Sequence, residues 1–370
     1  MNYKKFILPA FIAILAFIAI NCGYNKPDYG DEIAASQLGK GQNSGKIGDT
    51  VYIKQNPDWK GFNRPMDIII GHEPFVYVAD TYNNRIVMMN LNGDILGTKA
   101  VQHPVALAQD FQDNLIVCAL LDTTVQGSSI SVSAVYKINL YASGHNIAEA
   151  PVTRLLPSGN DFRFIDEVKR REYTGVCVFY DNSFYVSRKG PENLSQVDPD
   201  NSILMFQKTA YAGGKKDTLI GRVPLITPEG TGLVSANKIS SLTPFNRRNL
   251  DFVVTLIGEN SFKTQWLQFV STGIFTGYVS KLQPVNAPIM TVNRFLQPED
   301  AAVDNSGNIF VADAAKDSIF KFNAYGEEQQ SFGGASVFNH PYAVAVYNKV
   351  VYVADTDNNR ILRFVLSTDM

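Results

Sequence analysis

The chain has 370 residues, which is enough for two average domains or for one large all-β domain. Its 23 Phe and 17 Tyr residues, together with many β-branched ones, favour strands, and long helical stretches are hard to find. The formal net charge of −2 argues against nucleic-acid binding, because a phosphate backbone requires a basic protein surface.

Residues 1–21 have the pattern of a secretory signal peptide. A basic head with Lys4 and Lys5 precedes an almost wholly apolar run from Phe6 to Ile20. As a helix this run would span about 22 Å, which is short of the roughly 30 Å hydrocarbon core of a bilayer. We therefore predict an export signal rather than a permanent transmembrane helix.

Cys22 ends the apolar run. The segment Ala19-Ile20-Asn21-Cys22 resembles the lipobox of bacterial lipoproteins, in which the cysteine becomes the acylated first residue of the mature protein. Asn21 departs from the small residue that is usual before the cysteine, and the alternative is an ordinary signal peptide with an incidental cysteine. The resemblance implies that Cys22 is a lipid anchor. It also implies export to the cell envelope as an outer-membrane lipoprotein, on the periplasmic or the surface face.

Residues 22–48 are polar and glycine-rich, with few side chains that could be buried. A segment of this composition acts as a flexible tether. We therefore expect the folded part of the protein to occupy residues 49–370.

An internal repeat dominates this folded part. Residues 76–86 read Val-Tyr-Val-Ala-Asp-Thr-Tyr-Asn-Asn-Arg-Ile, residues 351–361 repeat them with one change, and residues 309–313 begin a looser copy. Each copy follows an apolar strand that opens with a proline, at Pro65, Pro298 and Pro341. This order of motifs resembles the NHL repeat, which implies a β-propeller, because a single blade cannot bury both of its faces.

Each repeat carries an aspartate where its second strand ends. We expect this carboxylate to accept backbone N–H groups of the following turn, and the paired Asn residues to adopt the left-handed conformation that a tight turn requires. The arginine after the turn should stack or pair locally. These structural repeat residues are Asp80, Arg85, Asp313, Asp355 and Arg360.

Six blades can be counted. Four begin at Pro65, Pro104, Pro298 and Pro341, and two degenerate blades fit between them, with strands at 174–178 and 183–187 and at 239–242 and 252–255. Inserted loops are expected around 120–133, 141–172, 188–200 and 207–237. The last blade is one strand short, and residues 51–53 can supply that strand. The prediction is an all-β, six-bladed propeller of the NHL (TolB-like) type, with its ring closed by an N-terminal strand.

Propellers of this kind include enzymes, so their metal sites must be considered. A zinc site of the amidating-lyase type needs several histidines that converge on the channel, whereas His103 and His340 precede entry prolines and His72 and His145 fall in turns or loops. A calcium site of the lactonase type needs carboxylates from several blades. The list of acidic candidates at blade entries is short: Asp67, Glu299 and Asp300. We expect Asp67 and Asp300 to cap loops, and neither a resident metal nor another cofactor.

The remaining cysteines occupy positions that are small and apolar in other repeats. Cys118 replaces the alanine of Val-Ala-Asp, and Cys177 lies in an innermost strand. Both are interpreted as buried core residues, and a disulfide between them is the alternative.

These observations favour a membrane-tethered, monomeric, non-enzymatic binding or scaffold protein with a protein, peptide or glycan partner. The alternative is a hydrolase or lyase of the calcium lactonase or amidating-lyase type. Ligands of propellers bind at the mouth of the central channel, where variable loops converge. The candidate binding residues at blade entries are Arg64, Asp67, His103, Glu299, Asp300, His340 and Tyr342. The middle insertions are the competing location.

Overall fold

The computed structural model describes residues 50–245 and 248–370. The predicted signal peptide, Cys22 and the tether of residues 22–48 lie outside the described residues. Within the described ranges, no helix is both long enough and apolar enough to cross a membrane.

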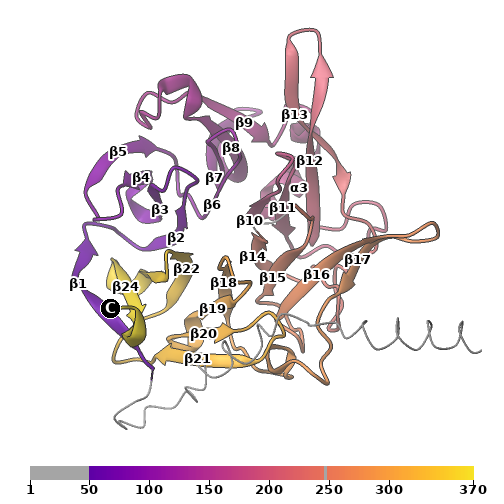
Figure 1. The fold of residues 1–370 in the computed structure, drawn as a ribbon. Coiled ribbons are helices and arrows are strands. Elements are labelled where there is room, and N and C mark those ends of the chain that lie inside the picture. Colours follow the sequence, from indigo (N-terminus) through magenta and orange to yellow (C-terminus); the bar gives the residue numbers. More distant parts are fainter. Residues whose placement is uncertain (1–49, 246–247) are drawn as a thin grey trace, which may run out of the picture. The chain divides into compact units, whose positions relative to one another are not determined.

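The described chain forms six antiparallel sheets of four strands, which are the blades of a propeller. Blades 1 to 3 contain β2 (Pro65–Ile70), β3 (Val76–Asp80), β4 (Arg85–Met89) and β5 (Ile95–Ala100); β6 (Ala106–Gln109), β7 (Asn114–Val125), β8 (Ser128–Asn139) and β9 (Val152–Leu156); and β10 (Glu172–Val178), β11 (Phe184–Lys189), β12 (Ser202–Tyr211) and β13 (Gly214–Arg222). Blades 4 to 6 contain β14 (Ile239–Pro244), β15 (Phe252–Leu256), β16 (Thr264–Ser271) and β17 (Thr276–Ser280); β18 (Pro298–Val303), β19 (Ile309–Asp313), β20 (Ser318–Phe322) and β21 (Glu328–Gly333); and β22 (Pro341–Tyr347), β23 (Val350–Asp355), β24 (Arg360–Leu366) and β1 (Tyr52–Lys60). The first strands of the blades surround the centre of the ring (Figure 1). The predicted all-β, six-bladed propeller is confirmed.

Strand β1 closes the ring, as predicted. It pairs antiparallel with β24, so that the first described strand completes the last blade. Tyr52 lies opposite Leu366 and Trp59 opposite Ile361, with a shift of register between Gln55 and Trp59. Closure by one strand from the other end of the chain joins the two ends of the sheet series and leaves no open interface between the first and last blades.

The helices within residues 50–245 and 248–370 are short. They are α3 (Ile165–Arg170) and the 3-10 turns η1 (Thr81–Asn83), η2 (Tyr141–Ser143), η3 (Asp161–Phe164), η4 (Pro288–Met290), η5 (Ala314–Lys316), η6 (Thr356–Asn358) and η7 (Ser367–Asp369). All except η7, which follows β24, lie in connections between strands. The expected insertion 141–172 contains η2, η3 and α3, but it also contains β9, the outermost strand of blade 2.

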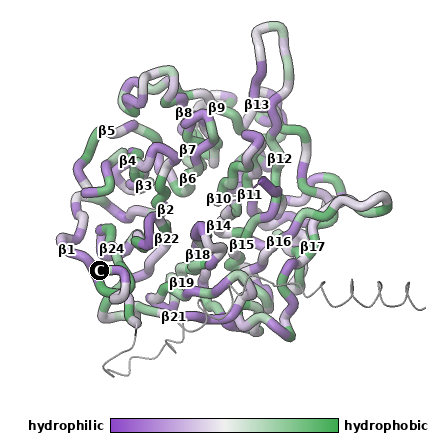
Figure 2. The backbone as a smooth tube through the Cα atoms, in the orientation of Figure 1, coloured by the Kyte–Doolittle hydropathy of each residue, from purple (hydrophilic) through white to green (hydrophobic). Residues whose placement is uncertain are grey.

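The middle strands of the blades are apolar on both faces because each blade is covered by two neighbours. In β3, Tyr77 and Ala79 pack in a core cluster with residues of blade 2, whereas Val76 and Val78 pack in a cluster with residues of blade 6. All five residues of β3 are buried. In Figure 2 hydrophobic and hydrophilic stretches follow one another repeatedly around the ring. A strand buried on both faces has a continuous apolar sequence rather than an alternating one, which explains the Val-Tyr-Val-Ala segments.

The repeat aspartate fastens the loop that leads into its own blade. The fully buried Asp80 accepts a hydrogen bond from the backbone N–H of Asn63, at 2.7 Å, ahead of the entry proline. Its other carboxylate oxygen accepts bonds from Asn83 Nδ2 at 2.9 Å and Arg85 Nε at 2.6 Å. The expectation that this aspartate accepts backbone N–H groups of the following turn is therefore wrong. Asp80 lies opposite Pro65 in the β2–β3 ladder, so its carboxylate is close to the backbone of the entry loop. The following turn contacts this carboxylate only through the side chains of Asn83 and Arg85.

Blade 6 repeats this arrangement, and blade 5 keeps the bonds to the entry loop. Asp355 accepts bonds from the N–H of Asn339, from Asn358 Nδ2 and from Arg360 Nε, at 2.7, 2.9 and 2.7 Å. Asp313 accepts the backbone N–H groups of the two residues before its entry proline. The three turns each end in a left-handed residue, at Asn84, Asp317 and Asn359.

Two of the expected inserted loops are strands. Residues 120–133 prolong the β7–β8 hairpin, with Leu120 opposite Ser133. Residues 207–222 belong to the projecting β12–β13 hairpin, where Gln207 lies opposite Thr218 (Figure 1). The sequence shows their length but not their pairing, because their polar outer segments lack the apolar pattern of the buried strands.

Candidate functional site

Bulges bring one side chain of most innermost strands into the mouth of the central channel. In five blades the pairing of the first two strands shifts just after the entry, so that one residue is skipped. The skipped residues are Met66, Thr174, Ser240, Glu299 and Tyr342, and all of them line one cavity. A bulge re-aims a side chain without breaking the rest of the ladder. The repeat thus places a variable residue at the same point of each of these blades.

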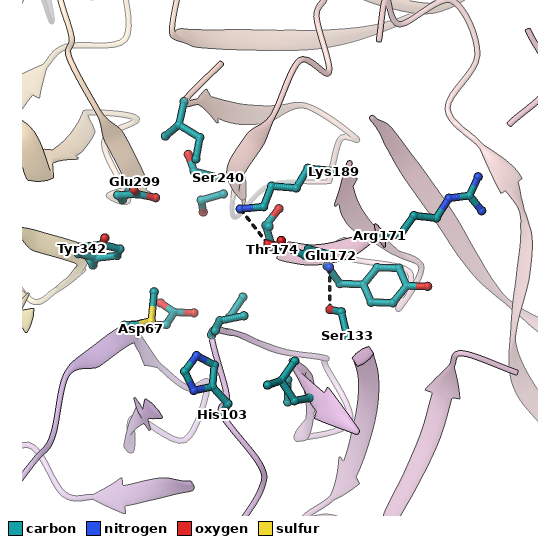
Figure 3. A pocket seen from close by; sticks show the side chains of 18 of the residues that line it. Asp67, His103, Ser133, Arg171, Glu172, Thr174, Lys189, Ser240, Glu299 and Tyr342 are labelled. Atoms are coloured by element: carbon teal, nitrogen blue, oxygen red, sulfur yellow. Dashed lines mark hydrogen bonds and ion pairs between the residues drawn. The ribbon is translucent and has the colours of Figure 1, made fainter. Parts of the chain in front are cut away.

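This mouth cavity has a volume of about 450 Å³. Its lining mixes both signs of charge with hydroxyl groups and a few apolar side chains. The charged lining residues are Asp67, Lys169, Arg171, Glu172, Lys189, Glu299 and Asp300. Figure 3 shows Glu299, Tyr342 and Asp67 on one side of the cavity and Lys189, Thr174 and Glu172 on another.

Five of the seven predicted binding residues line the mouth cavity. They are Asp67, His103, Glu299, Asp300 and Tyr342. Arg64 and His340 are not part of the lining but share a partner, since both contact the carboxylate of Asp357, at 2.9 and 3.1 Å.

Arg64, His103 and His340 also have a common backbone role. Each precedes an entry proline with a positive φ of 49°, 47° and 51°, which is uncommon for residues other than glycine. Each donates its N–H to the side-chain oxygen of the left-handed turn residue in the preceding blade, with the acceptors Asn359, Asn84 and Asp317. The turn residue of the preceding blade thus fixes the backbone at these positions.

Asp67 and Asp300 lie at the floor of the mouth cavity and also line a second cavity of about 220 Å³ deeper in the channel. Asp67 accepts the N–H of Leu107 at 2.6 Å, and Asp300 accepts the N–H of Val344 at 3.0 Å. Each carboxylate therefore binds the innermost strand of the next blade. This differs from the expected capping of entry loops.

The two carboxyl groups at the channel floor are held in a low-dielectric setting. Burial, reinforced by the negative charge of Asp300, raises the pKa of Asp67 well above its usual range. Burial likewise raises the pKa of Asp300 to about 6, against the opposing hydrogen bond from Ser241 Oγ at 2.6 Å. The pair therefore takes up protons at a higher pH than exposed aspartates do.

Glu299 is the acidic group that faces the mouth cavity above them. Burial raises its pKa, while a hydrogen bond from Gln297 Nε2 at 2.5 Å and the charge of Lys189 oppose the rise. Burial also raises the pKa of Tyr342, and the nearby charge of Glu299 adds to this rise.

Sequence reasoning missed several residues of the cavity. Thr174 and Ser240 occupy the same repeat position as Glu299 and Tyr342, so an alignment of all the entry strands could have identified them. Lys189 had no such signal, because it lies in the degenerate third blade. Its Nζ pairs with Glu172 Oε2 at 3.0 Å across the β10–β11 ladder.

The remaining histidines and cysteines lie elsewhere. His72 stacks on Phe111 and lines the deeper cavity, and His145 lies 3.7 Å from Glu73. Among the described residues, no group of three or more His, Cys, Asp or Glu is arranged to hold a metal ion. Cys118 and Cys177 are buried and unpaired in different blade interfaces, which rules out the alternative of a disulfide between them. Burial raises the pKa of both thiols.

Several solved propellers are similar in fold. An auxiliary nutrient binding protein from Bacteroides thetaiotaomicron is 10% identical, with a TM-score of 0.55 over 85% of this chain and 72% of that one. Regucalcin from Agrobacterium tumefaciens, a calcium-binding protein, is 8% identical, with a TM-score of 0.53 over 85% and 93%. The PQQ-bound aldose sugar dehydrogenase of Streptomyces coelicolor is 11% identical, with a TM-score of 0.51 over 87% and 99%. At this identity the likeness shows the fold alone. No protein-family model and no curated protein matches the chain.

Proposed function

We propose that this protein is a membrane-tethered binding protein whose mouth cavity receives part of a peptide or glycan ligand, free or carried by a partner protein. The observation that carries the proposal is the set of bulged residues. Five blades present five different side chains to one cavity. Thr174 and Ser240 also bond to a backbone carbonyl of the next blade, whereas Met66, Glu299 and Tyr342 make no such bond among the described residues. A concave site with an apolar portion and a few convergent polar groups is the usual form of a ligand site.

The fold itself does not choose between binding and catalysis. Similar propellers include a nutrient binding protein, a calcium-binding protein and a sugar dehydrogenase, and one fold commonly hosts unrelated functions. A binding role is favoured because Asp67 and Asp300 already bind backbone N–H groups of the neighbouring blades. Their carboxylates thus have a structural role that requires no reaction.

A hydrolase or lyase is the second candidate. The observation in its favour is the raised pKa of Asp67 and Asp300 at the cavity floor, since carboxyl groups with raised pKa values suit acid–base chemistry. Conversion of a bound ligand during a binding experiment would support this candidate.

The mouth-cavity proposal is tested by ligand-observed saturation-transfer NMR with one mixture of short peptides and one of oligosaccharides. The double variant Glu299→Ala/Tyr342→Ala should weaken binding of any ligand found by about ten-fold or more, because both side chains line the cavity. The melting temperature should change little, since neither side chain is fully buried.

Lys349→Ala is the matched control for this experiment. Lys349 lies in the β22–β23 turn, at the far end of the blade from Tyr342, and its side chain is 72% exposed. Binding that survives the double variant but is lost when residues 190–197 are shortened would move the site to the insertions and overturn the proposal.

The membrane tether is a separate proposal that rests on the sequence around Cys22. Replacing Cys22 with serine should release the protein from the membrane fraction or leave it unprocessed, because the thiol is the atom that would be acylated. Fractionation of cells with immunoblotting checks this, with Cys177→Ser as the cysteine control. Unchanged processing and membrane retention of the Cys22 variant would contradict the anchor.

A further inference from the structure

Apart from Glu172, which pairs with Lys189, the acidic residues of the mouth cavity lie on one wall and its basic residues on another. Glu299, Asp300 and Asp67 belong to blades 5 and 1, whereas Lys189 and Lys169 come from blade 3 and the connection before it. Figure 3 shows Glu299 and Lys189 on different walls, with Ser240 between them and Thr174 beside Lys189. An electric field therefore runs across the cavity, and a ligand with both signs of charge can align with it.

In the described part of the chain, no protein cation is in contact with the acidic wall, and Lys189 acts on Glu299 only through its charge across the cavity. Among the described residues, Glu299 forms no ion pair, and its one side-chain hydrogen bond comes from the neutral amide of Gln297. The nearby carboxyl groups of Asp300 and Asp67 are likewise bound by neutral donors. A buried carboxylate is stabilised strongly when a cation pairs with it. A ligand ammonium group would supply that cation.

On the basic wall, Lys189 has an ion-pair partner that a ligand can replace. Lys189 pairs with Glu172, whose side chain is 63% exposed, so the bond competes with water and stabilises the protein little. A ligand carboxylate can take the place of Glu172 at little cost. Arg171, by contrast, is engaged with Asp200 and Asp198, at 2.6 and 2.9 Å, and stays in place.

We infer that the mouth cavity binds a short zwitterionic peptide, with its ammonium group at Glu299 and its carboxylate at Lys189. This inference rests on the proposed binding function and specifies its ligand class. The Ser240 hydroxyl lies between the two charges, and the Thr174 hydroxyl lies beside Lys189. Each donates its hydrogen to a backbone carbonyl and bonds to one hydroxyl of its own blade, which leaves one lone pair to accept a peptide N–H. Met66 and Val105 supply apolar contact. The cavity volume of about 450 Å³ accommodates a few residues.

The test uses the full-length protein and a mixture of tripeptides in four forms: with free termini, N-acetylated, C-amidated, and blocked at both ends. We expect N-acetylation to weaken binding by about ten-fold or more, because a charged hydrogen bond is lost. Glu299→Gln should weaken binding of free peptides by a similar factor but leave N-acetylated peptides unaffected. Lys189→Met should discriminate in the same way between free and C-amidated peptides. Such coupling shows which two groups interact.

The controls remove the same charges elsewhere. Glu259→Gln and Lys215→Ala change exposed residues outside the cavity and should leave all affinities unchanged. Equal binding of free and blocked peptides overturns the inference without requiring any variant to fold. Binding of neutral trisaccharides that is lost in Glu299→Ala/Tyr342→Ala, with no peptide bound, overturns the zwitterion inference while the mouth-cavity proposal stands.

Discussion

Replacing Trp59 with alanine is expected to lower the free energy of unfolding by about 3–5 kcal/mol, the usual cost of truncating a large buried aromatic side chain. Trp59 is 6% exposed and lies in the closing strand β1. Its ring lies 5.8 Å from that of Tyr352 and beneath the guanidinium of Arg363 at 4.7 Å, both in blade 6. It also packs against Gly93 of blade 1, where an added Cβ would meet the indole at 2.4 Å. One side chain thus joins the first blade to the last.

Urea unfolding followed by circular dichroism measures this loss. Lys60→Ala is the matched control, because Lys60 is the exposed neighbour of Trp59 on the same strand. The control should change stability by less than about 0.5 kcal/mol. A loss below about 1 kcal/mol for Trp59→Ala would show that the ring does not depend on the packing of β1.

The Asp355→Ala variant is expected to lose roughly 2–4 kcal/mol of stability, because a fully buried carboxylate with three hydrogen-bond donors is removed. The N–H of Asn339 then lacks its acceptor, and the guanidinium of Arg360 loses the closer of its two carboxylate partners. Thermal and urea unfolding give the size of the loss.

Asp369→Ala is the control for this second variant. Asp369 is the carboxylate of an ion pair whose lysine, Lys349, is 72% exposed, so its removal should cost less than about 1 kcal/mol. If Asp355→Ala were as stable as the wild type but bound no ligand, the repeat aspartate would belong to the binding site rather than to the framework.

The repeat therefore separates two kinds of position. The repeat aspartate and the left-handed turn residue accept hydrogen bonds from the backbone at a blade entry, of the same or the next blade. The residue after the entry position lines the mouth cavity, and at Met66, Glu299 and Tyr342 its side chain makes no bond to another blade within residues 50–245 and 248–370. A binding surface can change at these three bulged positions while the ring keeps its stability.

The sequence by itself determined the blades with clear repeats, their number and the closing strand. It could do so because the Val-Ala-Asp strand and its turn depend on contacts within about 20 residues, so the same residues recur wherever the same local structure forms. The continuous apolar sequences of the middle strands also predicted that both faces of a blade are covered by neighbouring blades. These features are local, and each copy confirms the others.

Only the tertiary structure decided how blade 3 is held together. In that blade Arg188 occupies the position of the repeat aspartate. A hydrogen-bond donor with a positive charge therefore stands where blades 1, 5 and 6 have a negatively charged acceptor. Arg188 donates to Pro199 O at 2.7 Å and pairs with Asp198 at 2.5 Å, and both acceptors come from the following insertion. No sequence motif predicts this arrangement, because the residues that bind Arg188 lie in an insertion that has no counterpart in the other repeats.

The mouth cavity likewise depends on ring closure. Glu299 and Lys189 are 110 positions apart in the sequence, and Asp67 and Asp300 are 233 apart. Their distances follow from the number of blades and from the bulge that turns each entry residue inward, not from any pattern near the residues themselves. Local sequence therefore specified which residues stand at blade entries, and only the closed ring determined which of them share one space, because long-range packing sets the spacing of the blades.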